Sequence, residues 1–160
     1  MSLDNVEDAF VLTPIQSGML YASLATPDQD TYVTYVTLGL SGSVDTEKLK
    51  RAWHSAYHMH QALRAEFHWD GLEEPLQVIA KEVKLPWVTL DWTGMSADQV
   101  DTSMYQLVAK ERLRKIDIST APLSRITLVK VAERRWRILW SVHHLLADGV
   151  STPNLSLIHI

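Results

Sequence analysis

The sequence predicts an α+β fold in which helices pack on a mixed, mostly antiparallel sheet. Two segments, 46–60 and 97–116, carry apolar residues at helical spacing, which is typical of helices that bury one face. Two others, 123–131 and 136–142, alternate apolar and polar residues on either side of the turn sequence AERR, which indicates a β-hairpin. At 160 residues the chain is long enough for one domain with a substantial core and short for two.

The first predicted elements are a helix and a strand. Thr13 is placed to cap a helix that starts at Pro14, where the missing N–H of proline costs nothing. We expect this helix to run to residue 24 and to stop before Pro27. Residues 31–40, TYVTYVTLGL, are rich in β-branched and aromatic residues, which predicts a strand.

The two long helices carry N-terminal caps and buried faces. Asp45 caps the segment 46–60, whose buried face is predicted from Leu49, Trp53, Ala56 and His60. Ser96 and Gln99 form a capping box for 97–116, whose faces are traced by Val100, Met104, Leu107, Val108 and the polar Glu111.

Three extended segments lie between these helices. Residues 63–69 alternate as a strand, Asp70-Gly71 opens a turn, and 74–79 return as its hairpin partner. Residues 83–92 are also extended but are interrupted by Pro86, so they form at best an edge strand.

Composition restricts the class of protein. Apolar residues make up 46% of the chain, as in ordinary globular proteins, and the net charge of −4 argues against nucleic acid as the main partner. The absence of cysteine removes disulfides, thiolate nucleophiles and cysteine zinc sites, and fits a reducing compartment. The acidic N-terminus lacks the apolar core of a signal peptide, and no apolar run reaches the length of a membrane span. We expect a cytoplasmic protein with no membrane partner.

The candidate functional segment is SVHHLLADG, residues 141–149, at the end of the last predicted strand. Consecutive strand side chains point to opposite faces, so one of His143 and His144 is expected to pack against the sheet and the other to be presented. A fixed neutral histidine is the usual general base near neutral pH. Asp148 and Gly149 predict a turn whose carboxylate braces the loop.

Two other interpretations of this segment stay open on these residues alone. His144 and Asp148, four residues apart, could chelate a metal ion from a helix, although the sequence offers no third ligand. Alternatively, both histidines are packed or solvated residues at a strand edge without a chemical role.

The segment HHLLADG resembles the HHxxxDG signature of the condensation domains of nonribosomal peptide synthetases, which are related to chloramphenicol acetyltransferase. Residues 12–24, LTPIQSGMLYASL, resemble the first motif of that family, and residues 60–79, HQALRAEFHWDGLEEPLQVI, resemble the second. Three motifs in the correct order are far more specific than any one of them. The form of the first motif, with WDGLEEPLQV and LPW, is most similar to the subtype that joins a D-configured donor to an L-configured acceptor.

The resemblance implies a chloramphenicol acetyltransferase-like lobe of a two-lobed acyltransferase with a tunnel between the lobes. Each substrate is a thioester on the phosphopantetheine arm of a carrier protein, and the acceptor amine attacks the donor carbonyl to form an amide. The implied partners are therefore donor and acceptor carrier proteins, the second lobe and adjacent synthetase domains. No cofactor and no metal ion is implied as bound directly.

By matching positions, the resemblance gives His144 the catalytic role, as acceptor of the amine proton or as the group that orients the nucleophile and stabilises the tetrahedral intermediate. These roles suit amide formation from a thioester, which needs a neutral amine, a proton acceptor and a stabilised oxyanion. The resemblance also makes the Gly149 N–H a candidate oxyanion contact, and it implies that Asp148 pairs with an arginine to shape the loop and that His143 packs beneath it.

The second motif contributes His60 and Arg64 as supporting residues, and the alternative for Arg64 is a charge on a surface strand. The chain departs from the family at Met59, where an arginine is usual, at Ala65 for threonine and at Val150 for tryptophan. We expect Met59 to loosen the support around the catalytic histidine.

We expect residues 1–152 to form the N-terminal lobe and residues 153–160 to be a tail that does not match the family. The tail resembles the translation of a sequencing adapter, which indicates a truncated or artefactual gene model. The expected function is peptide-bond formation by the parent domain, with this chain inactive alone.

Three alternatives are kept: an epimerisation domain fragment, a non-catalytic carrier-protein-binding fragment, and a stand-alone acyltransferase that uses coenzyme A. Gly18-Met19-Leu20 favours condensation over epimerisation, which tends to carry aromatic residues there.

Overall fold

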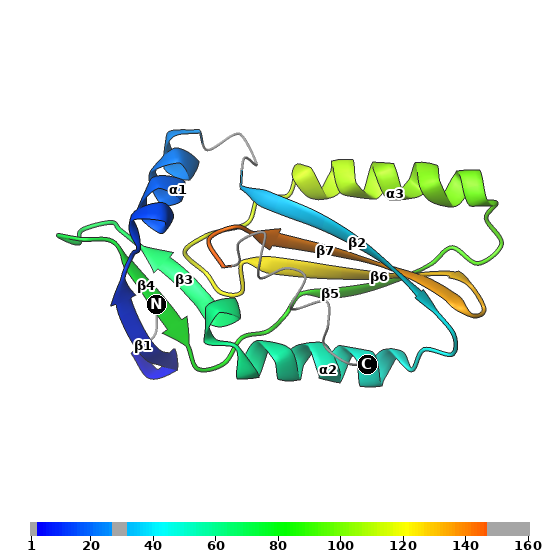
Figure 1. The fold of residues 1–160 in the computed structure, drawn as a ribbon, viewed down its shortest axis with the longest axis horizontal. Coiled ribbons are helices and arrows are strands. Elements are labelled where there is room, and N and C mark those ends of the chain that lie inside the picture. Colours follow the sequence, from blue (N-terminus) through cyan, green and yellow to red (C-terminus); the bar gives the residue numbers. More distant parts are fainter. Residues whose placement is uncertain (1–2, 27–31, 147–160) are drawn as a thin grey trace.

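The computed structural model describes residues 3–26 and 32–146 (Figure 1). Two short 3-10 helices, Leu3–Asn5 and Gln61–Arg64, accompany the main elements. In chain order, these are β1 (Val6–Val11), α1 (Pro14–Ala25), β2 (Val33–Ser41), α2 (Thr46–Met59), β3 (Ala65–His68), β4 (Leu76–Ala80), β5 (Trp87–Asp91), α3 (Ala97–Arg112), β6 (Ser124–Ala132) and β7 (Arg135–His143).

The strands form two sheets, where the sequence suggested one. The larger sheet has the order β2-β7-β6-β5 and is mixed, because β5 runs parallel to β6 while the other pairs are antiparallel. The smaller sheet, β1-β4-β3, is antiparallel throughout. The predicted α+β class with mostly antiparallel pairing is therefore confirmed, and β5 is an edge strand as predicted.

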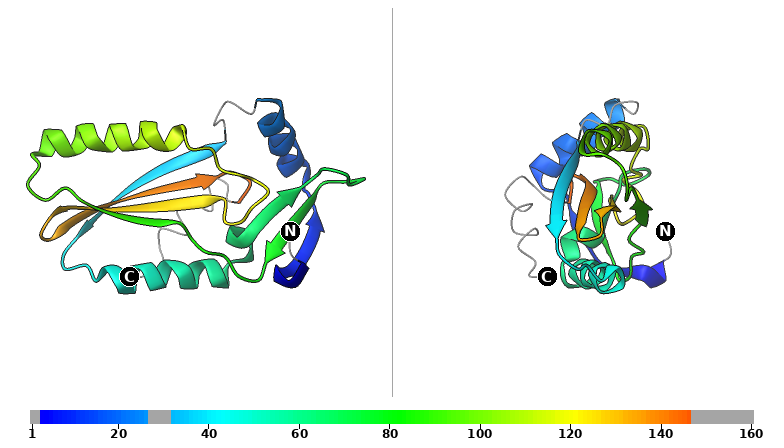
Figure 2. Two further views of the ribbon diagram at one scale, coloured as in Figure 1. Left: turned by 180° about the vertical axis from the view of Figure 1, so that it is seen from behind. Right: turned by 90° about the vertical axis from the view of Figure 1, so that its right-hand side faces the viewer.

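The two long helices cover opposite faces of the larger sheet (Figures 1 and 2). On the α2 face, the main core contains Trp136, Ile138, Trp140 and Val142, which alternate along β7. On the α3 face, Met104 packs with Val129 and Leu139 in a second cluster. Successive side chains of β7 point alternately into these two clusters, so both faces of the strand are buried, one towards α2 and the other towards α3.

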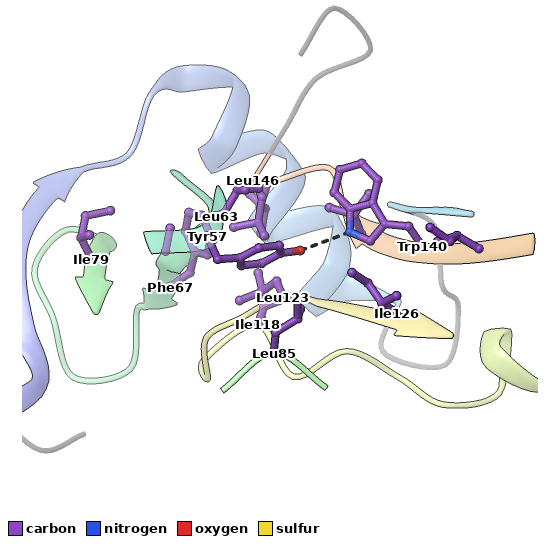
Figure 3. Packing of buried hydrophobic residues seen from close by; sticks show 14 of the residues in the cluster. Tyr57, Leu63, Phe67, Ile79, Leu85, Ile118, Leu123, Ile126, Trp140 and Leu146 are labelled. Carbon is purple, nitrogen blue, oxygen red and sulfur yellow. Dashed lines mark hydrogen bonds between the residues drawn. The ribbon is translucent and has the colours of Figure 1, made fainter. Parts of the chain in front are cut away.

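The core beside α2 also contains a buried polar chain. The indole N–H of Trp140 donates to the Tyr57 hydroxyl oxygen at 3.2 Å (Figure 3), and that hydroxyl lies 2.5 Å from the Ser124 hydroxyl. Burial raises the pKa of Tyr57 to about 12, so the phenol stays neutral. The three residues join α2, β6 and β7.

The helix starts are confirmed. Thr13 caps α1 in a full capping box with Gln16, and Ser96 caps α3 in a box with Gln99. Asp45 caps α2 by accepting hydrogen bonds from two backbone N–H groups.

The helix ends differ from the predicted ones. α3 ends at Arg112 instead of Ile116, and α2 ends at Met59, which leaves His60 exposed rather than on a buried face. Glu111, expected on a polar face, is only 4% exposed because it pairs with Arg125 of β6 at 2.9 Å.

The smaller sheet holds two further corrections. The strand predicted over 63–69 begins only at Ala65, after the 3-10 helix Gln61–Arg64. β1 was not predicted, since its sequence VEDAFV mixes two acidic residues with apolar ones and is mostly exposed. β1 forms a strand by pairing with β4, a partner distant in the chain that the residue pattern of β1 does not indicate. No helix among the described residues is long and apolar enough to cross a membrane.

Candidate functional site

The candidate site lies where β7 ends beside the start of β2. Val33 faces His143 and Thr34 faces Val142 in the antiparallel register. The backbone N–H of His143 donates to the Leu123 carbonyl at 3.0 Å, and that of His144 donates to the Tyr32 carbonyl at 2.8 Å. Backbone hydrogen bonds to both sides therefore fix the two histidines.

His143 is a buried, neutral imidazole. Its side chain belongs to a residue that is 5% exposed, and burial lowers its pKa to about 4, with a smaller contribution from the neighbouring charge of His144. The backbone N–H of Leu145 donates to Nδ1 at 3.2 Å, so Nδ1 carries no proton and Nε2 does. The Tyr32 ring lies 6.4 Å away, centroid to centroid.

His144 has different surroundings, as strand alternation predicts. It is only partly buried, and its Nε2 atom lies 2.7 Å from the Thr34 hydroxyl oxygen. Thr34 is not among the functional residues that the sequence predicts. The signal that could have found it is its place in a strand-forming segment, but the pairing register with β7 cannot be read from the sequence.

Gln16 connects the first motif to this site and was also missed as a functional candidate. Its side-chain oxygen accepts from the Thr13 N–H at 3.0 Å, while its Nε2 donates to the Gln77 side chain at 2.6 Å and to the Leu145 carbonyl at 3.5 Å. One amide thus links α1, β4 and the turn that follows the two histidines.

Arg64 is not a surface charge, so that alternative is wrong. The residue is 4% exposed, and its Nε donates to the Tyr57 carbonyl at 3.1 Å. Its Nη1 donates to the Ala80 carbonyl and to the Glu7 carboxylate, the latter at 2.5 Å. The hydrogen bond from Arg64 is the first cause that lowers the pKa of Glu7. Arg64 therefore ties the end of α2 to both β1 and β4.

The other second-motif residues lie at the surface. His60 is exposed just after α2, and within the described residues its imidazole makes no hydrogen bond. Met59 is 70% exposed. Within the same residues, neither His60 nor Arg64 hydrogen-bonds to His143 or His144, so the supporting role of the second motif stays a prediction.

Asp148 and Gly149 lie outside the described residues, as do the tail 153–160 and Val150. In residues 3–26 and 32–146, no group of three or more His, Asp or Glu side chains is arranged to hold a metal ion. Among the described residues, the buried neutral imidazole of His143 is followed by the partly buried imidazole of His144. Such an arrangement is suited to proton transfer by the second ring.

Comparison with known proteins identifies the class. The condensation domain family matches residues 6–156, so this chain belongs to the condensation domain family. It is 37% identical over 148 residues to a linear gramicidin synthase of Brevibacillus parabrevis, covering 92% of this chain and 3% of the relative. It is 28% identical over 144 residues to bacitracin synthase 1 of Bacillus licheniformis, covering 90% of this chain and 3% of that protein.

Solved structures confirm the fold. The starter condensation domain of rhizomide synthetase superposes with a TM-score of 0.81 at 19% identity, over 95% of this chain and 38% of that one. The first condensation domain of the CDA synthetase gives a TM-score of 0.80 at 19% identity, over 92% and 37%. The expected chloramphenicol acetyltransferase-like lobe is thus confirmed as a fold, and the chain spans well under half of these solved domains.

Proposed function

We propose that this chain is the first lobe of a nonribosomal peptide synthetase condensation domain and that its parent domain forms peptide bonds between carrier-bound thioesters. The observation that supports this most directly is His144, presented at the end of β7 beside the buried His143 in a member of the condensation domain family. The D-donor, L-acceptor subtype remains part of the proposal.

The chemistry assigned to His144 is proton acceptance from the acceptor amine, or orientation of that amine toward the donor thioester carbonyl. The amine nitrogen forms a bond to the carbonyl carbon, the carbon–sulfur bond breaks, and the thiol of the donor carrier arm leaves with a proton. A fixed group of this kind contributes through positioning and general base catalysis. Asp148 and Gly149 keep their proposed roles in the loop and at the oxyanion.

The partners in this proposal are the donor and acceptor carrier proteins, which bring both substrates on phosphopantetheine arms. The solved condensation domains extend well beyond the part that this chain matches. Because the proposed tunnel is made by two lobes, we infer that the 160-residue chain does not catalyse condensation alone. An epimerisation fragment and a coenzyme A-dependent acyltransferase are the competing functions.

The test uses a hybrid enzyme. The 148-residue segment of the Brevibacillus linear gramicidin synthase that this chain matches is replaced by the corresponding residues of this chain. The hybrid and the isolated chain each receive loaded donor and acceptor carriers, and the peptidyl thioester is measured by mass spectrometry. We expect product from the hybrid, none from the isolated chain, and a loss of about 100-fold or more in His144→Ala.

His58→Ala, at an exposed position of α2, is the matched control and is expected to keep full activity. A hybrid that forms product equally well with alanine at position 144 contradicts the catalytic assignment. Product from the isolated chain that depends on His144 contradicts its proposed inactivity. Racemised donor without a new amide supports the epimerisation alternative instead.

A further inference from the structure

We propose that Thr34 is a positioning residue for His144, and that its hydroxyl holds the imidazole in one ring orientation and one tautomer. This inference deepens the proposed function, on which the catalytic meaning of His144 rests. The hydrogen bond itself, at 2.7 Å between Thr34 Oγ1 and His144 Nε2, is a property of the chain that can be tested separately.

The register of β2 and β7 explains why these two side chains meet. Thr34 lies opposite Val142, and His144 follows Val142 by two residues, so all three side chains lie on the same face of the sheet. Diagonal neighbours of this kind lie about 7–8 Å apart, with their Cβ atoms somewhat closer, which is within reach of an aromatic side chain. The backbone N–H of His144 donates to the Tyr32 carbonyl at 2.8 Å, so the backbone of His144 is also held beside β2.

Thr34 is the polar residue at the start of an otherwise apolar stripe on β2. Val36, Leu38 and Leu40 follow it on the same face and pack against the main core. Packing alone gives no reason for a hydroxyl at position 34, since valine has nearly the same shape and also favours strands. Within the described residues, His144 Nε2 is the one hydrogen-bond partner of the Thr34 hydroxyl.

The conformation of Thr34 makes it a rigid support. A β-branched side chain on a strand has restricted rotation about χ1, so little entropy is lost when its hydroxyl is fixed. The strand itself is held by nine paired positions with β7, from Val33 to Ser41. A group mounted in this way fixes the ring it bonds to far better than a loop residue does.

The hydrogen bond also selects the proton position. A hydroxyl that donates to Nε2 requires the proton of neutral His144 on Nδ1, whereas a hydroxyl that accepts requires it on Nε2. Each direction of this hydrogen bond is compatible with one tautomer of the neutral ring. When the hydroxyl accepts, the lone pair of the ring lies on Nδ1, away from Thr34, as general base catalysis requires; when it donates, it occupies the lone pair on Nε2 itself.

The experiment is nitrogen-15 NMR of the imidazoles in the full 160-residue chain, compared with Thr34→Val, Thr34→Ser and Thr37→Val. Thr37 is exposed on the same strand and provides the control. The chain has seven histidines, so the spectrum of His144→Gln assigns the two His144 signals by their disappearance. Circular dichroism checks folding, and Thr34→Ala is the second variant if valine prevents folding.

We expect wild type and Thr34→Ser to show one predominant tautomer of His144. Thr34→Val and Thr34→Ala are expected to move both His144 nitrogen shifts away from their wild-type values, and Thr37→Val is expected to leave them unchanged. Identical His144 shifts in wild type, Thr34→Val and Thr34→Ala overturn the proposal. The spectra do not depend on peptide-bond formation, so an inactive hybrid enzyme refutes the proposed function without affecting this result.

Discussion

The Nδ1 atom of His143 accepts a hydrogen bond from the backbone N–H of Leu145 at 3.2 Å, which places the proton of the neutral ring on Nε2. Protonation of His143 places a second proton on Nδ1, which removes this hydrogen bond and also buries a positive charge. The buried surroundings therefore keep His143 neutral, whereas the side chain of His144 is only partly buried.

The first prediction is a loss of stability in mild acid. Because burial lowers the pKa of His143 from 6.5 to about 4, the unfolded chain binds a proton more readily than the folded one between these values. The contribution is fully present above pH 6.5 and is lost progressively as the pH falls toward 4, by up to roughly 3 kcal/mol in total. Urea unfolding at several pH values measures it.

The matched variant for this test is His143→Gln, which has no titrating ring. We expect its unfolding free energy to change less than that of wild type between pH 6.5 and 4. Equal pH dependence in both proteins would assign the acid sensitivity to other groups.

The second prediction concerns Gln16. In Gln16→Glu the side chain can still accept from the Thr13 N–H, but it can no longer donate to the Gln77 side chain or to the Leu145 carbonyl. We expect a loss of about 1 kcal/mol and faster hydrogen exchange at the amides of Leu145 and Leu146. Gln106→Glu, exposed on α3, is the control and is expected to change neither quantity. Unchanged exchange in Gln16→Glu contradicts the proposed link.

The third prediction concerns the buried phenol. Tyr57→Phe removes the partner of both the Trp140 indole and the Ser124 hydroxyl, so two buried polar groups lose a hydrogen bond. We expect the free energy of unfolding to fall by about 1–3 kcal/mol in urea titrations. Tyr105→Phe makes the same chemical change at a residue that is 79% exposed and is expected to have no effect. Equal stabilities of the two variants would refute the role of this chain of hydrogen bonds.

The fourth prediction concerns Arg64. Arg64→Lys keeps the positive charge beside Glu7 but cannot reproduce the fork that also reaches the Tyr57 and Ala80 carbonyls. We expect a loss of about 2–3 kcal/mol, measured by chemical denaturation. The exposed Arg51→Lys on α2 is the control, with a change near zero. A tolerated lysine at position 64 would show that the charge alone is sufficient.

The elements that depend on local physics can be predicted from the order of residues alone. The caps Thr13, Asp45 and Ser96 satisfy backbone N–H groups within three residues, so their signals are local and the predictions were correct. The β6–β7 hairpin is local in the same sense, since alternation and a short turn fix its pairing. The three ordered motifs likewise indicate the condensation domain family from the sequence alone, and the family match over residues 6–156 confirms it.

Features that depend on partners distant in the chain required the folded structure. Glu111 was predicted as a polar residue of its helix, and a surface charge was the alternative for Arg64, yet both are buried, with ion pairs to Arg125 and Glu7 that compensate their burial. The contact between Thr34 and His144 spans 110 positions and follows from the register of β2 on β7. The apolar stripes of the two strands exclude a shift of one residue, which would turn Thr34 to the opposite face. A shift of two residues keeps the faces but separates Thr34 from His144, and neither segment alone specifies which of these registers forms.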